Sequence, residues 1–478
     1  MTSTPTEFVG LCQETKTDKR SIGILTISEK EQSVRFVDFA DGVPLFPPEN
    51  LDVVAEDGRY LTLLGCINAG WEQKNREGKR ISSSKVIANK LVIGDSPWSP
   101  ESLISTALCT FDGASEAMHF SAHLEHKYSE GGVGNDAGDA QKTESTIVHL
   151  DRLKLFEVDS DGLTVKAYLT MHSRMSFSEP TRKFVPTLSV AFAGAPTVDT
   201  FLNELLVVVW FFTLSLGRYG APRDVHVTAK RNSEPEVIDE QNSPLVFHEV
   251  RQIWSRVDIH DLSRRYYAIC QLQEENELEA CKRCLELWIK RREDWSGAYS
   301  HSAASLSMQG MIDKERLLAA FAWFESIPVS DVLGPLCDDV VAKIADAAVE
   351  AAIAFDCNKS APLIRSVVGN LKIASTSDRI AARIKILRAR FGNEVVPERL
   401  ETSCAAAVKL RGKLAHGRVN EDIPFSRMAD ATFAMELVSF LSMYVDLPIS
   451  SSAPGRMRGH PCMVYLLSEP LSNDARNR

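Results

Sequence analysis

The first half of the chain contains short runs of β-branched and aromatic residues that are separated by turn residues. Examples are SIGILTIS, YLTLLGCI, LTVKAYLTM and TLSVAFAG. Such runs, bounded by Gly, Asp and Ser, are typical of β-strands. The apolar segment at 205–217 predicts one helix, and DVHVTAK predicts a strand after it. We therefore expect a β-rich domain over residues 1–229.

The second half changes to the spacing of α-helices. Two stripes of apolar residues recur every three or four positions. The first consists of Ile380, Ile384, Leu387 and Phe391, and the second of Phe433, Leu437, Phe440 and Tyr444. Gly392 and Pro448 follow the stripes, at positions where helices are expected to end. The pattern predicts an all-α bundle.

These two patterns together predict an α+β protein with several domains. A polar stretch, KRNSEPEVIDEQNSP, separates them and has the composition of a linker. The expected segments are a β-rich domain at 1–229, a linker at 230–244, a helical connecting region at 245–312, a helical domain at 313–447 and a loose tail at 448–478.

The N-terminus, MTSTPTEFVG, lacks the basic and apolar regions of a secretory signal. The apolar segment at 205–217 is shorter than the roughly 20 residues that span a membrane, so we expect a buried helix. Ten cysteines are scattered along the chain. In a chain without an export signal they indicate reduced thiols, and we expect a cytoplasmic protein with no membrane partner. The close pair in CKRC lies in a helical pattern and is expected to be structural.

Charge is distributed unevenly along the chain. Between Ile364 and Arg418 there are twelve Lys or Arg and four Asp or Glu, a local charge of +8. The net charge is −10, so the remainder carries about −18. A basic segment in an acidic protein is either a solvated face or a binding surface for phosphates. The candidate phosphate contacts are Arg379, Arg383, Arg388, Lys409, Lys413 and Arg418.

Two other motifs contain residue types that could bind a phosphate or a metal ion. In GWEQKNREGKRISSS the glycine spacing is wrong for a phosphate-binding loop, and an exposed hairpin is the expected structure. His119, His123 and His126 could share one face of a helix and bind zinc with Glu116 and Glu125. Because the surrounding segment does not have a clear helical pattern, a zinc enzyme is the more distant alternative.

The segment KLRGKLAHGR places Arg411 and His416 five positions apart. A histidine near its ordinary pKa can move protons to and from a ribose hydroxyl and a leaving oxygen, and a guanidinium can stabilise a phosphate in the transition state. On a regular helix the two side chains point about 140° apart. Their convergence requires either a bend at Gly412 or a two-fold dimer.

The segment LRGKLAHG resembles the Arg-x(4–6)-His signature of HEPN ribonucleases. The segments DKERLLAAFAWFESI and VVGNLKIASTSDRIAARIKILRARFG precede it in the order of the ApeA-like HEPN domain. The pattern SIGILTI … YLTLLGC and the segment FFTLSLGRYG resemble the N-terminal domain of ApeA-type anti-phage proteins. The resemblance covers most of the chain.

This resemblance implies a metal-independent endoribonuclease without cofactors, which cuts RNA after phage infection and halts the bacterial host. It implies Arg411 and His416 as the catalytic pair, Glu325 as an acidic residue that orients one of them, and a homodimer or higher oligomer through the HEPN domain. A phage-derived trigger is the expected activator. The family usually has a polar residue after the arginine, whereas this chain has Gly412. The alternative is therefore a scaffold that binds RNA or protein and has lost activity.

Overall fold

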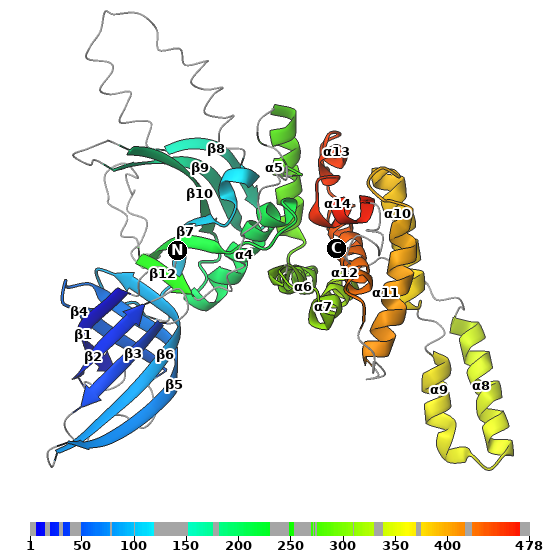
Figure 1. Ribbon diagram of the computed structural model, residues 1–478, viewed down its shortest axis with the longest axis horizontal. Coiled ribbons are helices and arrows are strands. Elements are labelled where there is room, and N and C mark those ends of the chain that lie inside the picture. The colour runs from blue at the N-terminus through cyan, green and yellow to red at the C-terminus, as the bar shows by residue number, and fades with distance from the viewer. Residues whose placement is uncertain are drawn as a thin grey trace, which may run out of the picture. The chain divides into compact units, whose positions relative to one another are not determined.

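The computed structural model describes residues 6–14, 20–27, 32–38, 49–76, 79–99, 101–118, 152–174, 181–229, 248–252, 269–270, 272, 275–308, 310–328, 338–369, 374–415 and 423–468. The chain forms two compact units (Figure 1). Unit 1 comprises residues 1–213, 220–256 and 271–290, and unit 2 comprises 214–219, 257–270 and 291–478. A β-rich region is followed by a helical region, which confirms the predicted fold class.

Unit 1 contains antiparallel strands that join into one twelve-stranded sheet in the described part of the chain. The strands are β1 (Thr6–Glu14), β2 (Arg20–Ile27), β3 (Gln32–Asp38), β4 (Asn50–Ala55), β5 (Tyr60–Arg76), β6 (Lys79–Gly94), β7 (Ile104–Phe111), β8 (Arg152–Ser160), β9 (Leu163–Arg174), β10 (Thr181–Phe192), β11 (Pro222–Ala229) and β12 (His248–Gln252). The predicted hairpin is formed by the long strands β5 and β6.

The first six strands close on themselves. They follow the order β3-β2-β1-β4-β5-β6, and an additional pairing of β3 with β6 joins the two ends. Along β4 the side chains alternate, so that Leu51, Val53 and Ala55 are buried and their neighbours are partly exposed. This alternation follows from the two-residue period of a strand. The inward-facing residues of the strands form one apolar core, which fills the interior of the closed sheet.

The sheet continues beyond the closed part along strand β6. Residues 82–87 of β6 pair with β3, and residues 90–93 pair with β12. From β12 the order continues as β11-β7-β10-β9-β8. Strand β12 lies in the region that we expected to be helical, so the β-rich part extends further along the chain than predicted. The predicted linker at 230–244 lies outside the described residues.

Two longer helices, α4 (Val198–Ser215) and α5 (Glu275–Lys290), pack near this second part of the sheet. A single helical turn, α1 (Ala114–Ala117), follows β7. The ring of Phe212 on α4 lies 5.7 Å from that of Phe111 on β7, and the indole of Trp288 on α5 donates to the Val207 carbonyl at 2.9 Å. By length and composition helix α4 could cross a membrane, but 67% of its 18 residues are buried within the protein. The prediction of a buried helix is confirmed.

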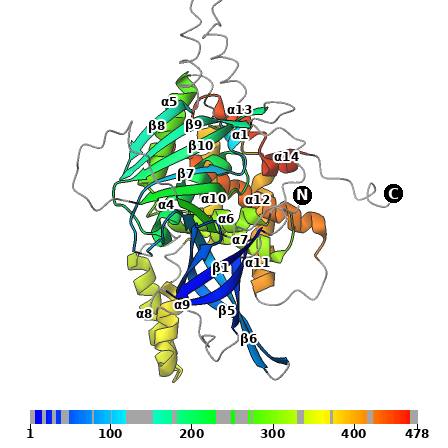
Figure 2. The same ribbon diagram turned by 90° about the vertical axis from the view of Figure 1, so that its left-hand side faces the viewer.

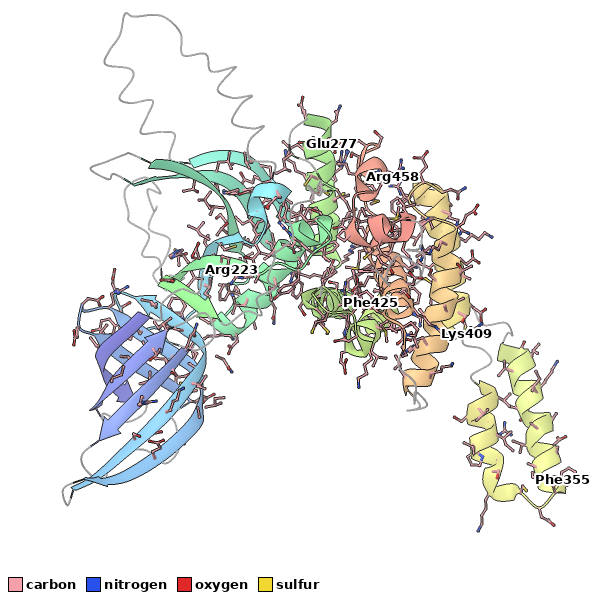
Figure 3. The ribbon with its side chains drawn as sticks, viewed as in Figure 1. Arg223, Glu277, Phe355, Lys409, Phe425 and Arg458 are labelled. Atoms are coloured by element: carbon pink, nitrogen blue, oxygen red, sulfur yellow. The ribbon has the colours of Figure 1, made fainter. Side chains whose placement is uncertain are left out.

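Unit 2 is helical throughout its described part. Its helices are α6 (Ser296–Ser307), α7 (Lys314–Ser326), α8 (Asp338–Ala354), η2 (Asn358–Ser360), α9 (Ala361–Gly369), α10 (Thr376–Phe391), α11 (Arg399–Ala415), α12 (Phe425–Tyr444), α13 (Ala453–Met457) and α14 (Pro461–Leu467). Helix α12 is central and contacts α7, α10, α11 and α14. Helices α8 and α9 lie side by side (Figures 1 and 2), and Phe355 at their connection is 81% exposed (Figure 3).

Both predicted apolar stripes lie on helices of this bundle. All four residues of the first stripe are buried on α10, and the helix ends at Gly392, whose φ of 81° is accessible to glycine. In the second stripe, Leu437, Phe440 and Tyr444 are buried, and the ring of Phe433 lies 4.6 Å from that of Tyr465.

The expectation of a loose C-terminal tail is wrong for residues 453–467. Helices α13 and α14 form there and bury apolar side chains, which include Met457, Cys462 and Met463. Helix α14 packs on α12. These helices have only five and seven residues and lie among Pro, Gly and Ser, so the sequence shows no helical period there and only the packing reveals them.

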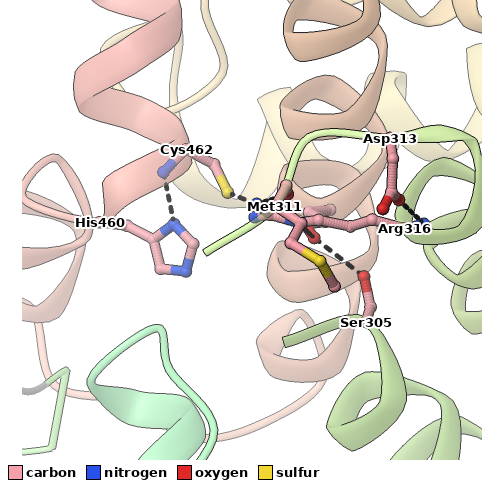
Figure 4. A network of polar contacts seen from close by, with 7 residues as sticks. Ser305, Met311, Asp313, Arg316, His460 and Cys462 are labelled. Atoms are coloured by element: carbon pink, nitrogen blue, oxygen red, sulfur yellow. Dashed lines mark hydrogen bonds and ion pairs between the residues drawn. The ribbon is translucent and has the colours of Figure 1, made fainter. Parts of the chain in front are cut away.

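A buried ion pair lies in the interior of unit 2 (Figure 4). Arg316 of α7 donates to both carboxylate oxygens of Glu436 of α12 at 2.8 Å, and the two side chains are 2% and 1% exposed. The Ser305 hydroxyl also donates to this carboxylate at 2.9 Å, and the Cys462 thiol lies 3.5 Å from it. These contacts satisfy a charge that would otherwise be costly to bury, and they connect α6, α7, α12 and α14.

Candidate functional site

The candidate site is built around Arg411, near the C-terminal end of α11. Its guanidinium forms a two-point ion pair with Glu325 of α7, in which one nitrogen donates to Oε1 and the other to Oε2 at 2.9 Å. The two residues are 86 positions apart in the sequence. Both side chains keep about a third of their surface exposed. The pair is therefore held in a fixed geometry and remains accessible to a ligand.

Helix α7 supplies the support for this arginine. The helix begins after Asp313, whose carboxylate accepts from the Arg316 backbone N–H at 2.9 Å and so caps the first turn. Phe321 lies one turn before Glu325 on the same face. The Arg411 guanidinium carbon is 4.9 Å from the centre of the Phe321 ring, a distance typical of a cation–π contact.

A second arginine reaches the same face of α7 from α10. This helix begins with a reciprocal cap, in which Ser375 and Asp378 each bond to the backbone of the other. Arg379, the next residue, places its guanidinium carbon 5.7 Å from the centre of the Phe324 ring. Phe321 and Phe324 are three residues apart, so Arg379 and Arg411 contact neighbouring side chains of α7.

Two other predicted phosphate contacts on α10 have different surroundings. Arg383 is 7% exposed and lies beside Ile384 on the buried face, so it is not a surface contact for RNA as predicted. Burial lowers the pKa of Arg383, and the attraction of Asp446 opposes this effect. Arg388 forms an ion pair with Glu401 of α11 at 3.1 Å. Arg383 is thus held within the helical core, and the charge of Arg388 is paired with a carboxylate.

Lys409 and Lys413 are exposed on α11 (Figure 3 labels Lys409). Each is two residues from Arg411 and therefore points in a direction about 160° from it around the helix. They do not join the arginine at the surface of α7. Their position fits a solvated face, which was one of the two interpretations of the basic segment.

A bend at Gly412 was one of the two arrangements that the sequence left open, and the described part of α11 is continuous through this residue. Helix α11 continues through this residue to Ala415, and Gly412 is exposed with no heavy atom within 4 Å of the position where a Cβ would lie. His416 and Arg418 lie outside the described residues, so the contacts of the predicted catalytic histidine stay a prediction.

The zinc alternative also concerns residues outside the described part. His119, His123, His126 and Glu125 lie there, whereas Glu116 belongs to α1. Among the residues that the structure describes, no group of three or more His, Cys, Asp or Glu side chains is placed to hold a metal ion. Cys281 and Cys284 are buried on α5, which fits their expected structural role.

A groove of about 240 Å³ lies between α10 and α11. Its lining combines apolar residues with a few polar ones: Ser377, Asp378, Ile380, Ala381, Glu401, Cys404, Ala405 and Val408. Arg411 is not among them.

Phe321 and Phe324 were not predicted to support the two arginines. Their spacing in FAWFES, next to Glu325, was the available signal.

Comparison with known proteins identifies the N-terminal part of the chain. The family model of the ApeA N-terminal domain 1 matches residues 10–269, which is more than half of the 478 residues. No curated protein and no solved structure matches the chain. The matched region spans the strands of unit 1 from β1 to β12 and confirms the predicted N-terminal resemblance, whereas α6–α14 lie outside it. The chain belongs to the family of proteins with an ApeA N-terminal domain 1.

Proposed function

We propose that the protein is a metal-independent endoribonuclease of the HEPN type that acts in anti-phage defence in the bacterial cytoplasm. One observation carries this proposal. Arg411 and Glu325, selected from the sequence as parts of one catalytic site, form a two-point ion pair although 86 residues separate them. The membership of unit 1 in the ApeA N-terminal family supports the role in defence.

The reaction follows from the chemistry of the two catalytic residues. His416 takes the proton of a ribose 2′-hydroxyl, the 2′-oxygen forms a bond to phosphorus, and the bond from phosphorus to the 5′-oxygen breaks. A proton is returned to the 5′-oxygen, and the products are a 2′,3′-cyclic phosphate and a 5′-hydroxyl. General acid–base catalysis of this kind contributes about 10²–10⁴-fold to the rate.

Arg411 stabilises the negative charge that accumulates on the phosphate oxygens during this reaction. Glu325 occupies one edge of the guanidinium and fixes its plane above Phe321. A guanidinium has five N–H donors, so others remain for a phosphate. Glu325 therefore acts as a positioning residue for Arg411.

Helix α11 is continuous through Gly412, which favours the second of the two arrangements that the sequence offered. In this proposal a homodimer through the helical domain places the Arg411 and His416 pairs of both subunits at one groove. In this proposal RNA is the substrate, a phage-derived signal is the trigger, and no cofactor takes part.

The test is cleavage of RNA by the purified protein in EDTA, with analysis of the new ends. Arg411→Ala and His416→Ala should abolish cleavage, and the wild type should leave cyclic phosphates. Lys413→Ala is the matched control, because it removes a cation from the opposite side of α11. Cleavage that stops on chelation and returns with a divalent ion would refute the mechanism.

A second candidate function is an inactive scaffold. It is favoured by the ion pair itself, because Glu325 neutralises the charge of Arg411, and by the absence of a polar side chain at Gly412. The same experiment separates the two functions. A scaffold would bind partners without cleaving RNA, and Arg411→Ala would leave its activity in the cell unchanged.

A further inference from the structure

We propose that Arg379 forms a second phosphate subsite beside Arg411 and supplies the net positive charge that attracts RNA to the site. The inference rests on the proposed function, because it assigns a role within the same RNA-binding site. Arg379 has this role, and the neighbouring cations Arg383 and Lys385 on the same helix do not.

The first observation concerns the net charge at Arg411. Its two terminal nitrogens face the two carboxylate oxygens of Glu325, so the pair as a whole is close to neutral. A neutral pair attracts a polyanion weakly at long range, although it can stabilise a phosphate at short range. A further positive charge is needed to draw RNA into contact.

The second observation concerns the cations nearby on α10. Arg383 is buried, and the nearby Asp446 attracts its charge. The side chain of Arg379 is only partly buried and forms no hydrogen bond or ion pair with any residue that the structure describes. Arg379 is therefore a cation at this end of α10 whose donors are available.

The third observation is geometric. Arg379 and Arg411 lie on Phe324 and Phe321, which are three residues apart on α7. Residues at this spacing are neighbours on a helix surface, so the two guanidinium groups contact neighbouring side chains of α7. An aromatic support restrains a guanidinium and leaves its N–H groups free to form paired bonds to a phosphate. RNA whose scissile phosphate lies at Arg411 would place a neighbouring phosphate at Arg379.

The start of α10 adds to this arrangement. The positive end of the helix dipole lies at residues 376–379, although Asp378 in the cap offsets part of it. Arg379 is thus in the first turn of the helix, where a bound anion is favoured. By contrast, Lys385 is exposed on the same helix but points in a direction about 120° from that of Arg379 around its axis.

The test measures binding of a fluorescent single-stranded RNA 12-mer to full-length protein that carries His416→Ala, so that the RNA is not cut. Arg379→Gln should weaken binding about tenfold, the effect of one lost charge-assisted contact. It should also reduce the slope of log K against log salt by about 0.7. Lys385→Gln, which removes the same charge, should change affinity by less than about twofold and leave the slope intact.

Two further measurements separate a binding role from a structural one. Arg379→Lys should recover part of the affinity, because it restores the charge without the planar fork. In the background that retains His416, Arg379→Gln should raise KM much more than it lowers kcat. The melting temperature of Arg379→Gln should equal that of Lys385→Gln.

The outcomes also separate this inference from the proposed function. If the wild type does not cleave RNA but its binding depends on Arg379, the subsite stands and the ribonuclease proposal fails. If the wild type cleaves RNA and Arg379→Gln behaves like Lys385→Gln, the subsite is refuted and the ribonuclease proposal stands. If the protein does not bind RNA, both are refuted.

Discussion

Replacement of Glu436 by Gln tests how the helical unit that carries the candidate site is held together. Glu436 accepts two bonds at 2.8 Å from Arg316 and one from Ser305 at 2.9 Å, and both members of the ion pair are at most 2% exposed. Burial alone would lower the pKa of Arg316, but the attraction of Glu436 is stronger in sum and the pKa is raised. A guanidinium is not deprotonated in proteins, so Arg316 remains charged after the substitution.

The expected loss of stability follows from this burial. Removal of one partner of a buried ion pair costs about 3–5 kcal/mol, because the other charge is left without compensation. For a unit of about 150–250 residues, each kcal/mol shifts the melting temperature by about 2–4 °C. The transition of unit 2 should therefore move down by about 6–20 °C.

The assay is differential scanning calorimetry with helical circular dichroism as a second probe, because most of the described helices belong to unit 2. Two probes are needed because a protein with two units does not unfold in one two-state step. The double variant Arg316→Met/Glu436→Leu should recover most of the loss, since an apolar pair replaces the ion pair. Full recovery is not expected, because the Ser305 hydroxyl loses its acceptor.

A shift of less than about 2 °C in Glu436→Gln would refute the reasoning. It would mean that Arg316 finds water or another acceptor and is not buried as described. A double variant less stable than either single variant would also contradict it, because the ion pair would then not be the source of the penalty.

Four further predictions concern single residues of unit 2. Burial lowers the pKa of His460 to about 3, whereas in the unfolded chain it binds a proton below pH about 6.5. The free energy of unfolding should therefore fall as pH decreases through this window, by up to about 1.4 kcal/mol per pH unit, and His460→Asn should reduce this slope in denaturation at pH 7 and 5. Glu325→Gln should lower kcat for RNA about tenfold, since it weakens the contacts that fix the Arg411 guanidinium, and an unchanged kcat would contradict the positioning role. Gly392→Ala should destabilise unit 2 by about 1–3 kcal/mol, because φ is 81° and ψ is 167° there, and equal stability would show that the backbone adapts. Gly412→Ala should instead stabilise it by about 0.5–1 kcal/mol, as expected inside a regular helix, and a loss of stability would indicate a bend that α11 does not show.

The sequence alone was sufficient for features that depend on local spacing. The stripe from Ile380 to Phe391 predicted α10, and Gly392 marked its end. The β-branched runs predicted the strands of unit 1, and FAWFES placed Glu325 on a helix. These features could be predicted because a helix or strand exposes the same face repeatedly, and the residues on the buried face must be apolar at that period.

The tertiary structure decided which distant residues meet. It joined β3 to β6 and so closed the sheet, paired Arg411 with Glu325, and placed the Arg379 guanidinium against Phe324 of α7. It also buried Arg383, although Arg383 belongs to the same basic segment as Lys385, which is exposed on the same helix. Contacts of this kind depend on how several helices pack at once, and a local pattern carries no information on the partner. The helices at 453–467 show the same limit, since their short apolar segments become helical only through packing on α12.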